Sequence, residues 1–336
     1  MKALSLASPG GLDRLSLVER ADPGAPGPGE IRVRLQASSL NYHDLGVVSG
    51  RAPSADGRIP MSDGAGTVEA VGAGVTSLTP GDSVVSLFFP DWADGEPFLP
   101  DFSRTPGDGL DGYGREFVVT PEHWFTRAPR GYSPEEAATL TTAGLTAWRA
   151  LVVNGGIKAG DSVLALGCGG VSIFALQLAK AMGATVIITS SSDEKLEKAR
   201  ALGADHLINY RKTERWAKAA LDVTDGRGVD HVIEVGGPGT LPQSIEAGRI
   251  GGHISLIGVL TGRGGEVPTS LLMRRQQRLQ GLIVGSRRHQ LDFVRALDAL
   301  PLRPAIDRTF ALAEAADAFR YEQEGRHFGK ICLSIP

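Results

Sequence analysis

The stretch SVLALGCGGVSIFALQLAKAMGATVIITSSS, residues 162–192, decides how this chain folds. It begins with an apolar run, Ser162–Leu166, that has the length of a buried strand. A turn with three glycines follows, and then come a run with helical apolar spacing, Val171–Met182, and a second strand-like run, Thr185–Thr189. The order of strand, glycine turn, helix and strand is typical of a unit that binds a dinucleotide. We therefore predict a nicotinamide cofactor at this turn.

The glycine turn is the predicted site of the cofactor's pyrophosphate. Gly167 can take the sharp turn, and Gly169 and Gly170 allow the backbone to approach a phosphate whose charge the helix N-terminus favours. Glycine triplets also occur in ordinary turns, but here the neighbouring elements stand where the dinucleotide fold requires them. Cys168 either has a lowered thiol pKa at the helix N-terminus or is simply small enough to fit there. The predicted contacts are Gly167, Cys168, Gly169, Gly170 and Val171.

The end of the second strand indicates which dinucleotide binds, because an acid there would bind the ribose hydroxyls of NAD. The chain instead has Thr189 followed by three serines, which leave room for the 2′-phosphate of NADPH. Two alternatives stay open: Ser191 or Ser192 caps the next helix, or Asp193 selects NAD from inside that helix. We predict NADPH, bound by Ser190, Ser191, Ser192, Lys195 and Tyr210.

The rest of the chain has two different patterns. Before about residue 125, short strand-like runs alternate with turns, and they include one long irregular stretch, Phe88–Gly112. After Pro134, strands and helices alternate, which indicates βαβ units and a parallel sheet with helices on both faces. The tail is predicted to form a helix, Leu312–Glu324, and a strand, Lys330–Ser334, that rejoins the first domain. Other predicted strands include Ile31–Gln36, Gly66–Val71, Ser83–Phe88, Glu116–Val119 and Leu282–Val284.

Length and composition agree with a two-domain α/β protein of the cytoplasm. We predict a β-rich domain, residues 1–125 with 287–336, and a doubly wound domain, residues 126–286. The net charge of −3 and the pI near 6.2 give no electrostatic reason to bind nucleic acid or an anionic membrane. Two cysteines, Cys168 and Cys332, exclude a disulfide framework and a cysteine-ligated structural zinc. The chain shows neither a signal-peptide pattern nor an apolar run of the ~20 residues that a membrane helix needs.

Several segments, taken together, make the chain resemble the medium-chain dehydrogenase/reductase superfamily. The match keeps its order over nearly the whole chain, so it is more specific than any single motif. The resemblance implies a GroES-like catalytic domain formed by both chain ends, a Rossmann domain, and an active site in the cleft that separates them. Besides the glycine turn, the matching segments are Asn41-Tyr42-His43-Asp44, Gly64-Ala65-Gly66, Gly81-Asp82, Ala143-Gly144-Leu145-Thr146-Ala147-Trp148, Gly203-Ala204-Asp205 and Phe328-Gly329-Lys330.

Zinc-dependent members of this superfamily bind their catalytic metal with two cysteines and one histidine. The resemblance places Asn41 at the first cysteine, Ser62 at the histidine and about Thr142 at the second cysteine, with Asp63 at a neighbouring glutamate. None of the three offers a soft or an imidazole ligand, and the four structural cysteines of those enzymes are absent as well. We therefore expect no metal. The chain resembles the zinc-free, quinone-oxidoreductase-like branch, whose members use NADPH.

Without a metal, hydride addition to a conjugated carbonyl or a quinone is easier than addition to a simple ketone. The developing enolate or hydroquinone anion spreads its charge and needs only hydrogen bonds and a late proton. The candidate catalytic residues are Tyr42, His43 and Asn41. The alternative for Tyr42 and His43 is structural, as a ring packed on the cofactor and a histidine bonded in a loop. Asp44 is expected to hold a turn or to cap a helix.

The resemblance implies further cofactor contacts at strand ends of the doubly wound domain and at the tail. Lys330 matches a terminal Gly-Lys pair near the cofactor, and the alternative for it is a surface lysine on the last strand. Phe88, Phe89, Trp92 and Phe98 either wall an apolar substrate pocket or seal the core of the first domain. The implied contacts are Asn41, Thr142, Thr146, Gly258, Val259, Leu260, Ile283, Val284, Gly285 and Lys330.

The leading hypothesis is an NADPH-dependent reductase of α,β-unsaturated carbonyls or quinones that works without a metal. A zinc-independent alcohol or ketone dehydrogenase is the second hypothesis, and a non-catalytic protein that senses NADPH or serves structurally is the third. The expected partners are a small-molecule substrate and a second copy of the chain. The homodimer is expected because the predicted strand Leu282–Val284 would form an apolar edge of the sheet.

Overall fold

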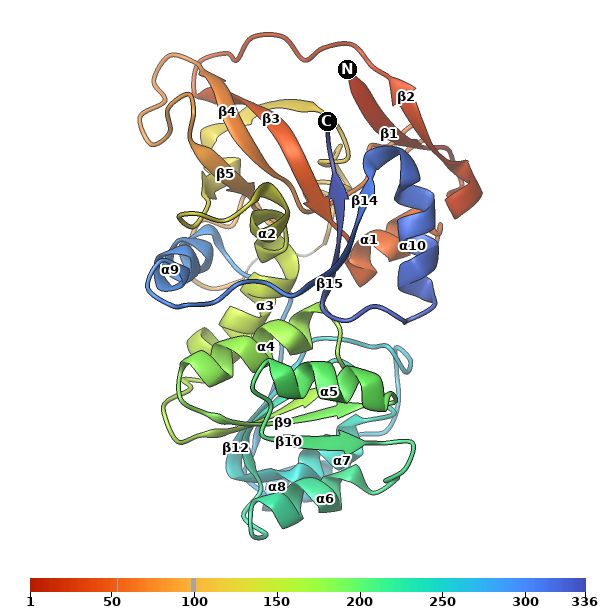
Figure 1. Ribbon diagram of the computed structural model, residues 1–336, viewed down its shortest axis with the longest axis vertical. Helices are drawn as coiled ribbons and strands as arrows, with labels where there is room; N and C mark the ends of the chain where they lie inside the picture. Colours follow the sequence, from red (N-terminus) through yellow and green to blue (C-terminus); the bar gives the residue numbers. More distant parts are fainter. Residues whose placement is uncertain (53, 98–100) are drawn as a thin grey trace. The chain divides into compact units, whose positions relative to one another are not determined.

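The computed structural model describes residues 1–52, 54–97 and 101–336, which form two compact units (Figure 1). One unit contains residues 1–145 and 284–336, and the other contains residues 146–283. The sequence predicts domain bounds of 1–125 with 287–336 and 126–286. The difference lies mainly in segment 126–145, where helix α2 (Pro134–Ala138) packs against strands of the first unit. A capping box starts α2: Ser133 accepts from the backbone of Glu136, whose side chain accepts from the backbone of Ser133.

Six parallel strands form the sheet of the unit 146–283, in the order β10-β9-β8-β11-β12-β13. In Figure 1 helices α4 and α5 cover one face, and α6, α7 and α8 lie on the other. This is the doubly wound order in which the strand sequence reverses between β8 and β11. The strands are β8 (Ser162–Leu166), β9 (Thr185–Ser190), β10 (His206–Asn209), β11 (Val229–Glu234), β12 (Gly248–Leu256) and β13 (Arg278–Gly281). The helices are α4 (Gly170–Ala181), α5 (Asp193–Ala201), α6 (Trp216–Val223), α7 (Leu241–Ala247) and α8 (Thr269–Arg274).

The last strand of this sheet corrects a prediction. Leu282–Val284 is not a strand; the edge strand β13 ends at Gly281, and Val284 has a left-handed φ of 44° that an extended strand does not tolerate. The edge itself carries Arg278 and Gln280, which are both exposed. A search for apolar runs misses such a strand because its polar side chains face water. The apolar-edge argument for a homodimer therefore loses its basis.

Seven strands form the main sheet of the other unit, in the order β14-β15-β3-β4-β5-β7, and β6 pairs with β3. The tail strand β15 (Lys330–Ser334) has the predicted bounds and lies antiparallel to β3, so the tail rejoins the first domain as expected. Helix α10 packs on β15, and α2 packs on β3, β4 and β5. The other strands of this unit are β1 (Lys2–Leu6), β2 (Leu15–Glu19), β3 (Glu30–Ser39), β4 (Ala65–Val71), β5 (Ser83–Ser86), β6 (Phe117–Pro121), β7 (Phe125–Arg127) and β14 (Ile306–Ala311). Its other helices include α1 (Tyr42–Val48), α9 (Arg287–Leu297) and α10 (Ala315–Gln323).

Residues 87–116 form neither a helix nor a strand wherever the structure describes them, as the irregular stretch predicts. The two-unit α/β architecture, with a GroES-like β-rich part and a Rossmann sheet, confirms the predicted fold class.

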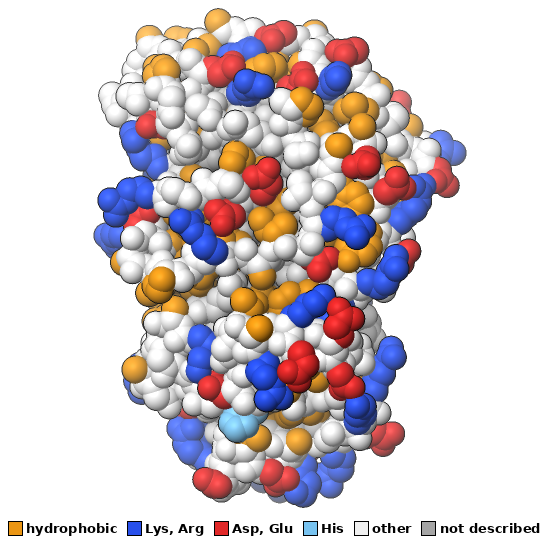
Figure 2. All heavy atoms as spheres, in the orientation of Figure 1, with side chains coloured by type: hydrophobic (Ala, Val, Ile, Leu, Met, Phe, Trp, Pro, Cys, Tyr) orange, Lys and Arg blue, Asp and Glu red, His pale blue; other side chains and the backbone are white. Residues whose placement is uncertain are grey.

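On the face shown in Figure 2, Lys and Arg side chains lie interspersed with Asp and Glu, in keeping with the net charge of −3. Within residues 1–52, 54–97 and 101–336, none of the helices has the length and apolar character needed to cross a bilayer.

Candidate active site

The strand order places the first candidate site at the carboxyl ends of β8 and β11, where an open α/β sheet binds its ligands. The glycine turn follows β8. Gly167 has a φ of 74°, and a Cβ added at Gly167 or Gly169 would meet no atom within 4 Å. The hydroxyl of Ser172, in the first turn of α4, donates to the carbonyl of Leu166 over 2.6 Å and fixes the helix start on the strand end. The turn is therefore open and rigid, which suits a bound pyrophosphate.

A second loop at this edge is held by one buried carboxylate. The side chain of Glu234, at the end of β11, has no exposed surface. Its Oε1 accepts hydrogen bonds from the backbone of Gly236 and Gly237 over 2.7 and 2.9 Å and from the hydroxyl of Thr240 over 2.6 Å. Its Oε2 accepts a short bond from the hydroxyl of Ser244. One side chain thus fixes the loop that enters α7 beside the glycine turn.

The loop after β12 is fixed in turn to the loop after β11. The hydroxyl of Thr261 donates to the carbonyl of Gly236 and accepts from the backbone of Gly239, both over 2.8 Å. This loop contains the predicted contacts Gly258, Val259 and Leu260, and the last two side chains are exposed.

The serines at the end of β9 have local partners. Ser190 accepts from the backbone of Ser192 over 3.2 Å, and Ser192 caps α5 by accepting from the backbone of Lys195 over 3.3 Å. The capping alternative that the sequence left open therefore holds for Ser192. Asp193 accepts from Asn209 over 2.7 Å and from Lys212 over 2.6 Å, and bonds from Lys212 and Asn209 lower its pKa. Its carboxylate is thus committed to β10 and the turn that follows.

The thiol of Cys168 corrects another expectation. Cys168 is buried, and this burial raises the pKa of its thiol above the ordinary value despite the opposing effects of Ser190 and Lys195. The lowered pKa that a helix N-terminus suggests is not found. The role of a small residue that fits the turn remains. Tyr210 is half-exposed, and its backbone donates to Ser190 over 3.0 Å.

The second candidate site lies in the unit 1–145 with 284–336 and is centred on Asp63. This side chain is fully buried, and its Oδ1 accepts from the hydroxyl of Thr142 over 2.6 Å. Its Oδ2 accepts from the hydroxyl of Ser39 over 2.5 Å and from the amide of Asn41 over 2.9 Å. Burial raises the pKa of Asp63 to about 6, while the ammonium of Lys330 opposes the rise and the carboxylate of Asp44 adds to it.

Lys330 supplies the cation of this network. It is 3% exposed, so the alternative of a surface lysine is wrong. Its Nζ donates to Oδ1 of Asn41 over 2.6 Å and, in a short bond, to the carbonyl of Leu40, and it lies 3.8 Å from Oδ2 of Asp63. Asp44 accepts from the amide of Asn41 over 3.0 Å and from the backbone of Ser62 over 2.8 Å. The network is therefore closed around one buried ammonium group.

Comparison with known proteins now identifies the fold family. Residues 27–130 match the alcohol dehydrogenase GroES-like domain, and residues 170–300 match the zinc-binding dehydrogenase family. The chain is 43% identical to a zinc-type alcohol dehydrogenase-like protein of Schizosaccharomyces pombe, over 97% of this chain and 96% of that protein. The chain belongs to the medium-chain dehydrogenase/reductase superfamily. This protein is thus an oxidoreductase of that superfamily.

Solved structures of the superfamily are similar over the full chain length. The structure of a proposed alcohol dehydrogenase from Sinorhizobium meliloti 1021 has 43% identity and a TM-score of 0.92, with 99% of this chain and 98% of that chain covered. An NAD-dependent alcohol dehydrogenase has 33% identity and a TM-score of 0.90 over all of both chains. A quinone oxidoreductase of Pseudomonas syringae has 29% identity and a TM-score of 0.82 over 99% of each chain. A crotonyl-CoA carboxylase/reductase bound to NADP has 26% identity and a TM-score of 0.86, over 99% of this chain and 94% of that chain.

The residues at the positions of the superfamily's zinc ligands do not fit a zinc ion. Asn41 offers an amide, and Ser62 and Thr142 offer hydroxyls, none of which is a preferred zinc ligand. The amide of Asn41 and the hydroxyl of Thr142 are already bonded to Asp63, and the carbonyl oxygen of Asn41 is bonded to Lys330. A buried ammonium beside these side chains would repel a second cation.

The three predicted catalytic residues of this dehydrogenase/reductase have different surroundings in the structure. Asn41 lies inside the network, with both ends of its amide bonded. Tyr42 is half-exposed, its hydroxyl accepts from Arg51 over 3.0 Å, and the guanidinium of Arg51 lies 4.9 Å from its ring centre. His43 is partly buried, and its Nε2 lies 3.3 Å from Oδ2 of Asp108.

The aromatic side chains of the irregular stretch pack with one another and with His43. Phe88, Phe89 and Trp92 are buried, which favours the core alternative for these three, whereas Phe102 is only partly buried. Phe98 lies outside the described residues. Among the other predicted contacts, Thr146 and Val284 are buried, and Ile283 is half-exposed.

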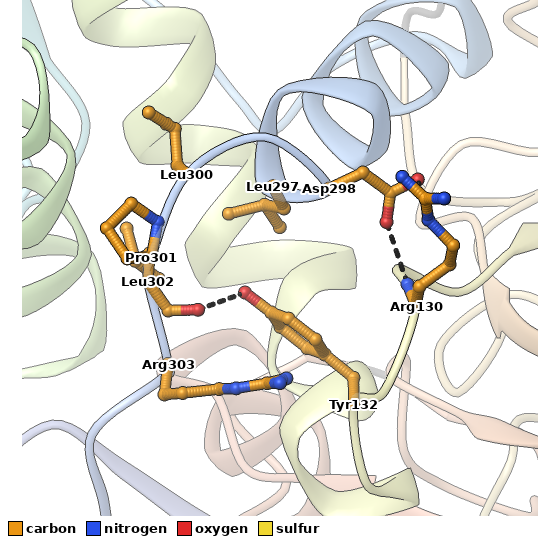
Figure 3. Close-up of a pocket in the computed structure, with 8 residues that line it drawn as sticks. All are labelled: Arg130, Tyr132, Leu297, Asp298, Leu300, Pro301, Leu302 and Arg303. Carbon is orange, nitrogen blue, oxygen red and sulfur yellow. Dashed lines mark hydrogen bonds and ion pairs between the residues drawn. The ribbon is translucent and has the colours of Figure 1, made fainter.

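Three functional candidates escaped sequence reasoning: Asp63 as the centre of its network, Asp108 and Glu234. Asp63 and Asp108 contact partners that only the fold brings together, whereas Glu234 bonds partners within 10 residues of it and stands just before a Gly-Gly pair, which marks a strand end. One further surface feature is unrelated to these sites. A hollow of about 160 Å³ is lined by residues at the end of α9 and before α2, where the hydroxyl of Tyr132 donates to Leu302 (Figure 3). It contains no residue that the sequence predicted to bind cofactor or substrate.

Proposed function

We propose that this protein is an NADPH-dependent reductase that adds hydride to an α,β-unsaturated carbonyl or a quinone without a metal. The observation that carries the proposal is the closed network in which Lys330 and Asp63 bind Asn41 and Thr142, the residues that the resemblance places at two of the superfamily's zinc ligands. A site without a Lewis acid favours acceptors that spread negative charge as hydride arrives. The similarity to a quinone oxidoreductase and to a crotonyl-CoA carboxylase/reductase supports the same substrate classes.

NADPH, when bound, supplies the hydride. We propose that the open glycine turn, Gly167 to Gly170, holds the pyrophosphate, because neither Gly167 nor Gly169 has an atom within 4 Å of its Cβ direction. Ser190, Ser191 and Lys195 at the end of β9 would receive the 2′-phosphate. The commitment of Asp193 to Asn209 and Lys212 weakens the alternative in which this acid selects NAD.

The chain's own residues fix the loops beside the cofactor and hold a positive charge in the site. The Glu234 and Thr261 loops fix the backbone around Gly258 to Leu260, which we propose to contact the nicotinamide or its ribose. Lys330 holds a positive charge that does not move, since its ammonium is bonded on two sides inside a buried site. Such a fixed charge stabilises negative charge that develops nearby more effectively than mobile water does.

The test compares turnover of a quinone, an enone and a saturated ketone, each with NADPH and with NADH. We expect turnover of the quinone or the enone, or of both, and a higher kcat/KM with NADPH. Turnover of the saturated ketone alone would instead establish a ketone dehydrogenase. Binding of NADPH without turnover of any of these compounds would favour a non-catalytic role.

A further inference from the structure

His43 differs from the other two predicted catalytic residues. Both ends of the Asn41 amide are hydrogen-bonded, and Tyr42 is half-exposed and contacts Arg51. His43 lies in the first turn of α1, two residues after the cap residue Asn41. Its side chain is 22% exposed, so water or a small molecule can reach it. An imidazole that solvent can reach is able to give up a proton and to take it back from water.

Among the residues that the structure describes, one carboxylate and two aromatic rings contact His43. The carboxylate of Asp108 lies 3.3 Å from Nε2 and is itself mostly buried, with 13% of its side chain exposed. The ring of Phe102 lies 4.7 Å from the imidazole centre and that of Phe88 lies 5.2 Å from it, in an edge-on arrangement. A carboxylate can only accept hydrogen bonds, so its position favours the orientation in which a protonated Nε2 faces Asp108. The proton on Nδ1 is then the one that faces away from Asp108.

We propose that His43, oriented by Asp108, is the acid that protonates the carbonyl oxygen of the substrate as it is reduced. The proposal rests on the proposed function and assigns the proton donor that this function needs. His43 is the catalytic residue, and Asp108 is a positioning residue that acts through it. The ring of Phe102, which is only partly buried, fits a planar conjugated acceptor beside the imidazole, because aromatic faces pack well on flat π systems.

The step balances without a further reagent. The β-carbon of an enone accepts the hydride, the electron pair of its C=C bond forms the enolate double bond, and the π pair of the carbonyl moves onto oxygen. That oxygen takes the Nδ1 proton of the His43 imidazolium, which becomes neutral imidazole. The enol turns into the saturated carbonyl in water, and His43 recovers a proton from solvent. A quinone gives a hydroquinone with the same count of one hydride and one proton.

The first experiment replaces His43 with Ala and measures kcat, NADPH affinity and thermal stability. We expect kcat for the enone and the quinone to fall by about 10²- to 10³-fold, the contribution typical of general acid catalysis. The dissociation constant of NADPH, measured by fluorescence titration, and the melting temperature should stay near those of the wild type. Added imidazole should restore part of the lost turnover in H43A. The matched control is His123→Ala, since His123 is exposed and stands in the short helix after β6.

The second experiment tests the positioning role of Asp108. Asp108→Asn should lower kcat by about tenfold and leave the KM of the substrate unchanged, because the proton donor is disturbed and not the binding surface. Asp108→Glu should recover part of the loss. Asp94→Asn in the same irregular stretch is the control, because Asp94 is exposed and its carboxylate accepts from the adjacent backbone of Gly95.

Three results would overturn the proposal. The first is that H43A keeps the kcat of the wild type. The second is that H43A loses kcat and added imidazole restores none of it. The third is that D108N changes the KM alone. Failure of the proposed function gives a different result, because the wild-type protein itself would then turn over neither quinone nor enone.

Discussion

Lys330 places a positive charge where water scarcely reaches, and its partners show how the fold tolerates this. Two carboxylates, Asp63 and Asp44, share the site with it and are 0% and 1% exposed. A buried charge that loses its partner is costly, since the remaining charge has neither water nor a counter-ion. Removal of one charged member of the network is therefore expected to destabilise the folded protein.

Lys330→Met should destabilise the protein and change how its stability depends on pH. The unfolding free energy should fall by about 3–5 kcal/mol, because the carboxylates of Asp63 and Asp44 lose their cation. Urea unfolding at several pH values measures this. Lys218→Met, on the exposed face of α6, is the control and should leave stability nearly unchanged. Equal stability of the two variants would show that the ammonium of Lys330 does not balance these acids.

The sign of the pH effect follows from the raised pKa of Asp63. Below pH 3.8, its ordinary value, Asp63 is protonated in both the folded and the unfolded chain. Between that value and about 6 the folded chain holds the proton more tightly, so stability falls as the pH rises. Without the opposing charge of Lys330 the folded pKa rises further, so the loss of stability in K330M should extend to higher pH.

At the scale of single residues, the sequence pointed to members of the network around Asp63 but not to the hydrogen bonds that join them. Asn41, Thr142 and Lys330 were each predicted, from a resemblance that compares positions. The hydrogen bonds that join them meet at Asp63, which lies 22 residues from Asn41 and 79 from Thr142. No local pattern encodes such contacts, because they depend on β3, β4 and α2 coming together. Asp108 was missed for the same reason, since it lies in an irregular stretch with no period.

Among the elements, the loop after β11 depends on one side chain. Glu234→Gln replaces one acceptor oxygen with an amide that donates, so it faces donors from Gly236, Gly237 or Ser244. We expect the dissociation constant of NADPH to rise by about tenfold, as an unsatisfied buried group costs roughly 1–3 kcal/mol. Fluorescence titration measures it. Glu246→Gln, whose carboxylate pairs with Arg215 near the surface, should bind NADPH like the wild type. Unchanged affinity in E234Q would show that this loop does not contact the cofactor.

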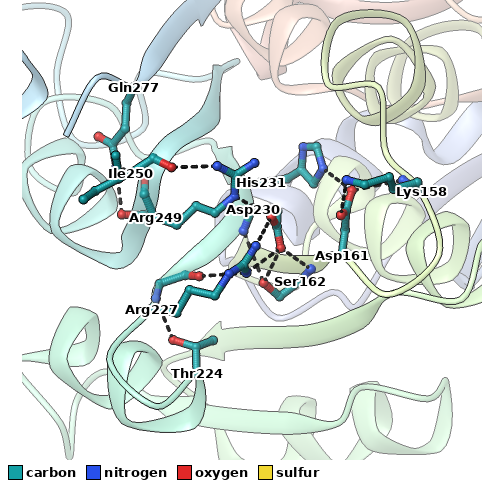
Figure 4. A network of polar contacts seen from close by, with 12 residues as sticks. Lys158, Asp161, Ser162, Thr224, Arg227, Asp230, His231, Arg249, Ile250 and Gln277 are labelled. Carbon is teal, nitrogen blue, oxygen red and sulfur yellow. Dashed lines mark hydrogen bonds and ion pairs between the residues drawn. The ribbon is translucent and has the colours of Figure 1, made fainter.

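At the other end of the same sheet, Asp230 joins β8, β11 and β12. Its carboxylate accepts from Ser162 over 2.9 Å, from Arg227 over 2.7 Å and from Arg249 over 2.5 Å (Figure 4). Burial opposes this charge, but hydrogen bonds from Arg227, Ser162 and Arg249 outweigh it and hold the pKa of Asp230 well below its usual range. The charged form therefore contributes stability above the unfolded pKa of 3.8, and this is lost as the pH falls.

Asp230→Asn should lower the unfolding free energy at pH 7 by about 2–4 kcal/mol, because two arginines lose a buried partner. The gap between the variant and the wild type should shrink below about pH 4, because the unfolded wild-type chain then takes up a proton at Asp230 that the folded chain does not bind. Denaturant unfolding at pH 7 and at about pH 3 checks both statements. Asp225→Asn is the control, since Asp225 is exposed and has a left-handed φ of 51° that Asn also tolerates. A gap that is independent of pH would contradict the role of the charge.

Element prediction succeeded where apolar periodicity was strong and failed where it was weak. The strand Lys330–Ser334 and the helix that begins at Pro134 were found where they lie. The edge strand β13 was placed four residues too late, because its exposed polar residues carry no apolar signal and the apolar run after it is not extended. Strands β1 and β2 were missed because each has only five residues, too few to show a clear periodicity, although Leu4 and Leu6 of β1 are buried.

For the whole molecule, part of the fold was predictable because strands and helices alternate regularly after the glycine turn. The cofactor-binding half follows from residues 162–192 and the βαβ units after them. The other half needed a resemblance over the full length, since its sheet joins strands from both ends of the chain, β3 and β15. Long-range pairing of this kind leaves no mark in a local window.

The absence of suitable zinc ligands leads to a prediction about the whole protein. Its two cysteines, Cys168 and Cys332, stand in different units and are both buried, and the pKa of each thiol is raised by burial, so neither is disposed to hold zinc as a thiolate. Treatment with a strong zinc chelator, followed by gel filtration, should leave kcat and the melting temperature unchanged. Emission spectroscopy should find far less than one zinc ion per chain. A different result would contradict this prediction: chelation abolishes turnover and added zinc restores it. Zinc at Asn41 would have to displace the hydrogen bond from Lys330 to Asn41 and the one from Asn41 to Asp63. The network of Lys330 could then not exist in the active protein.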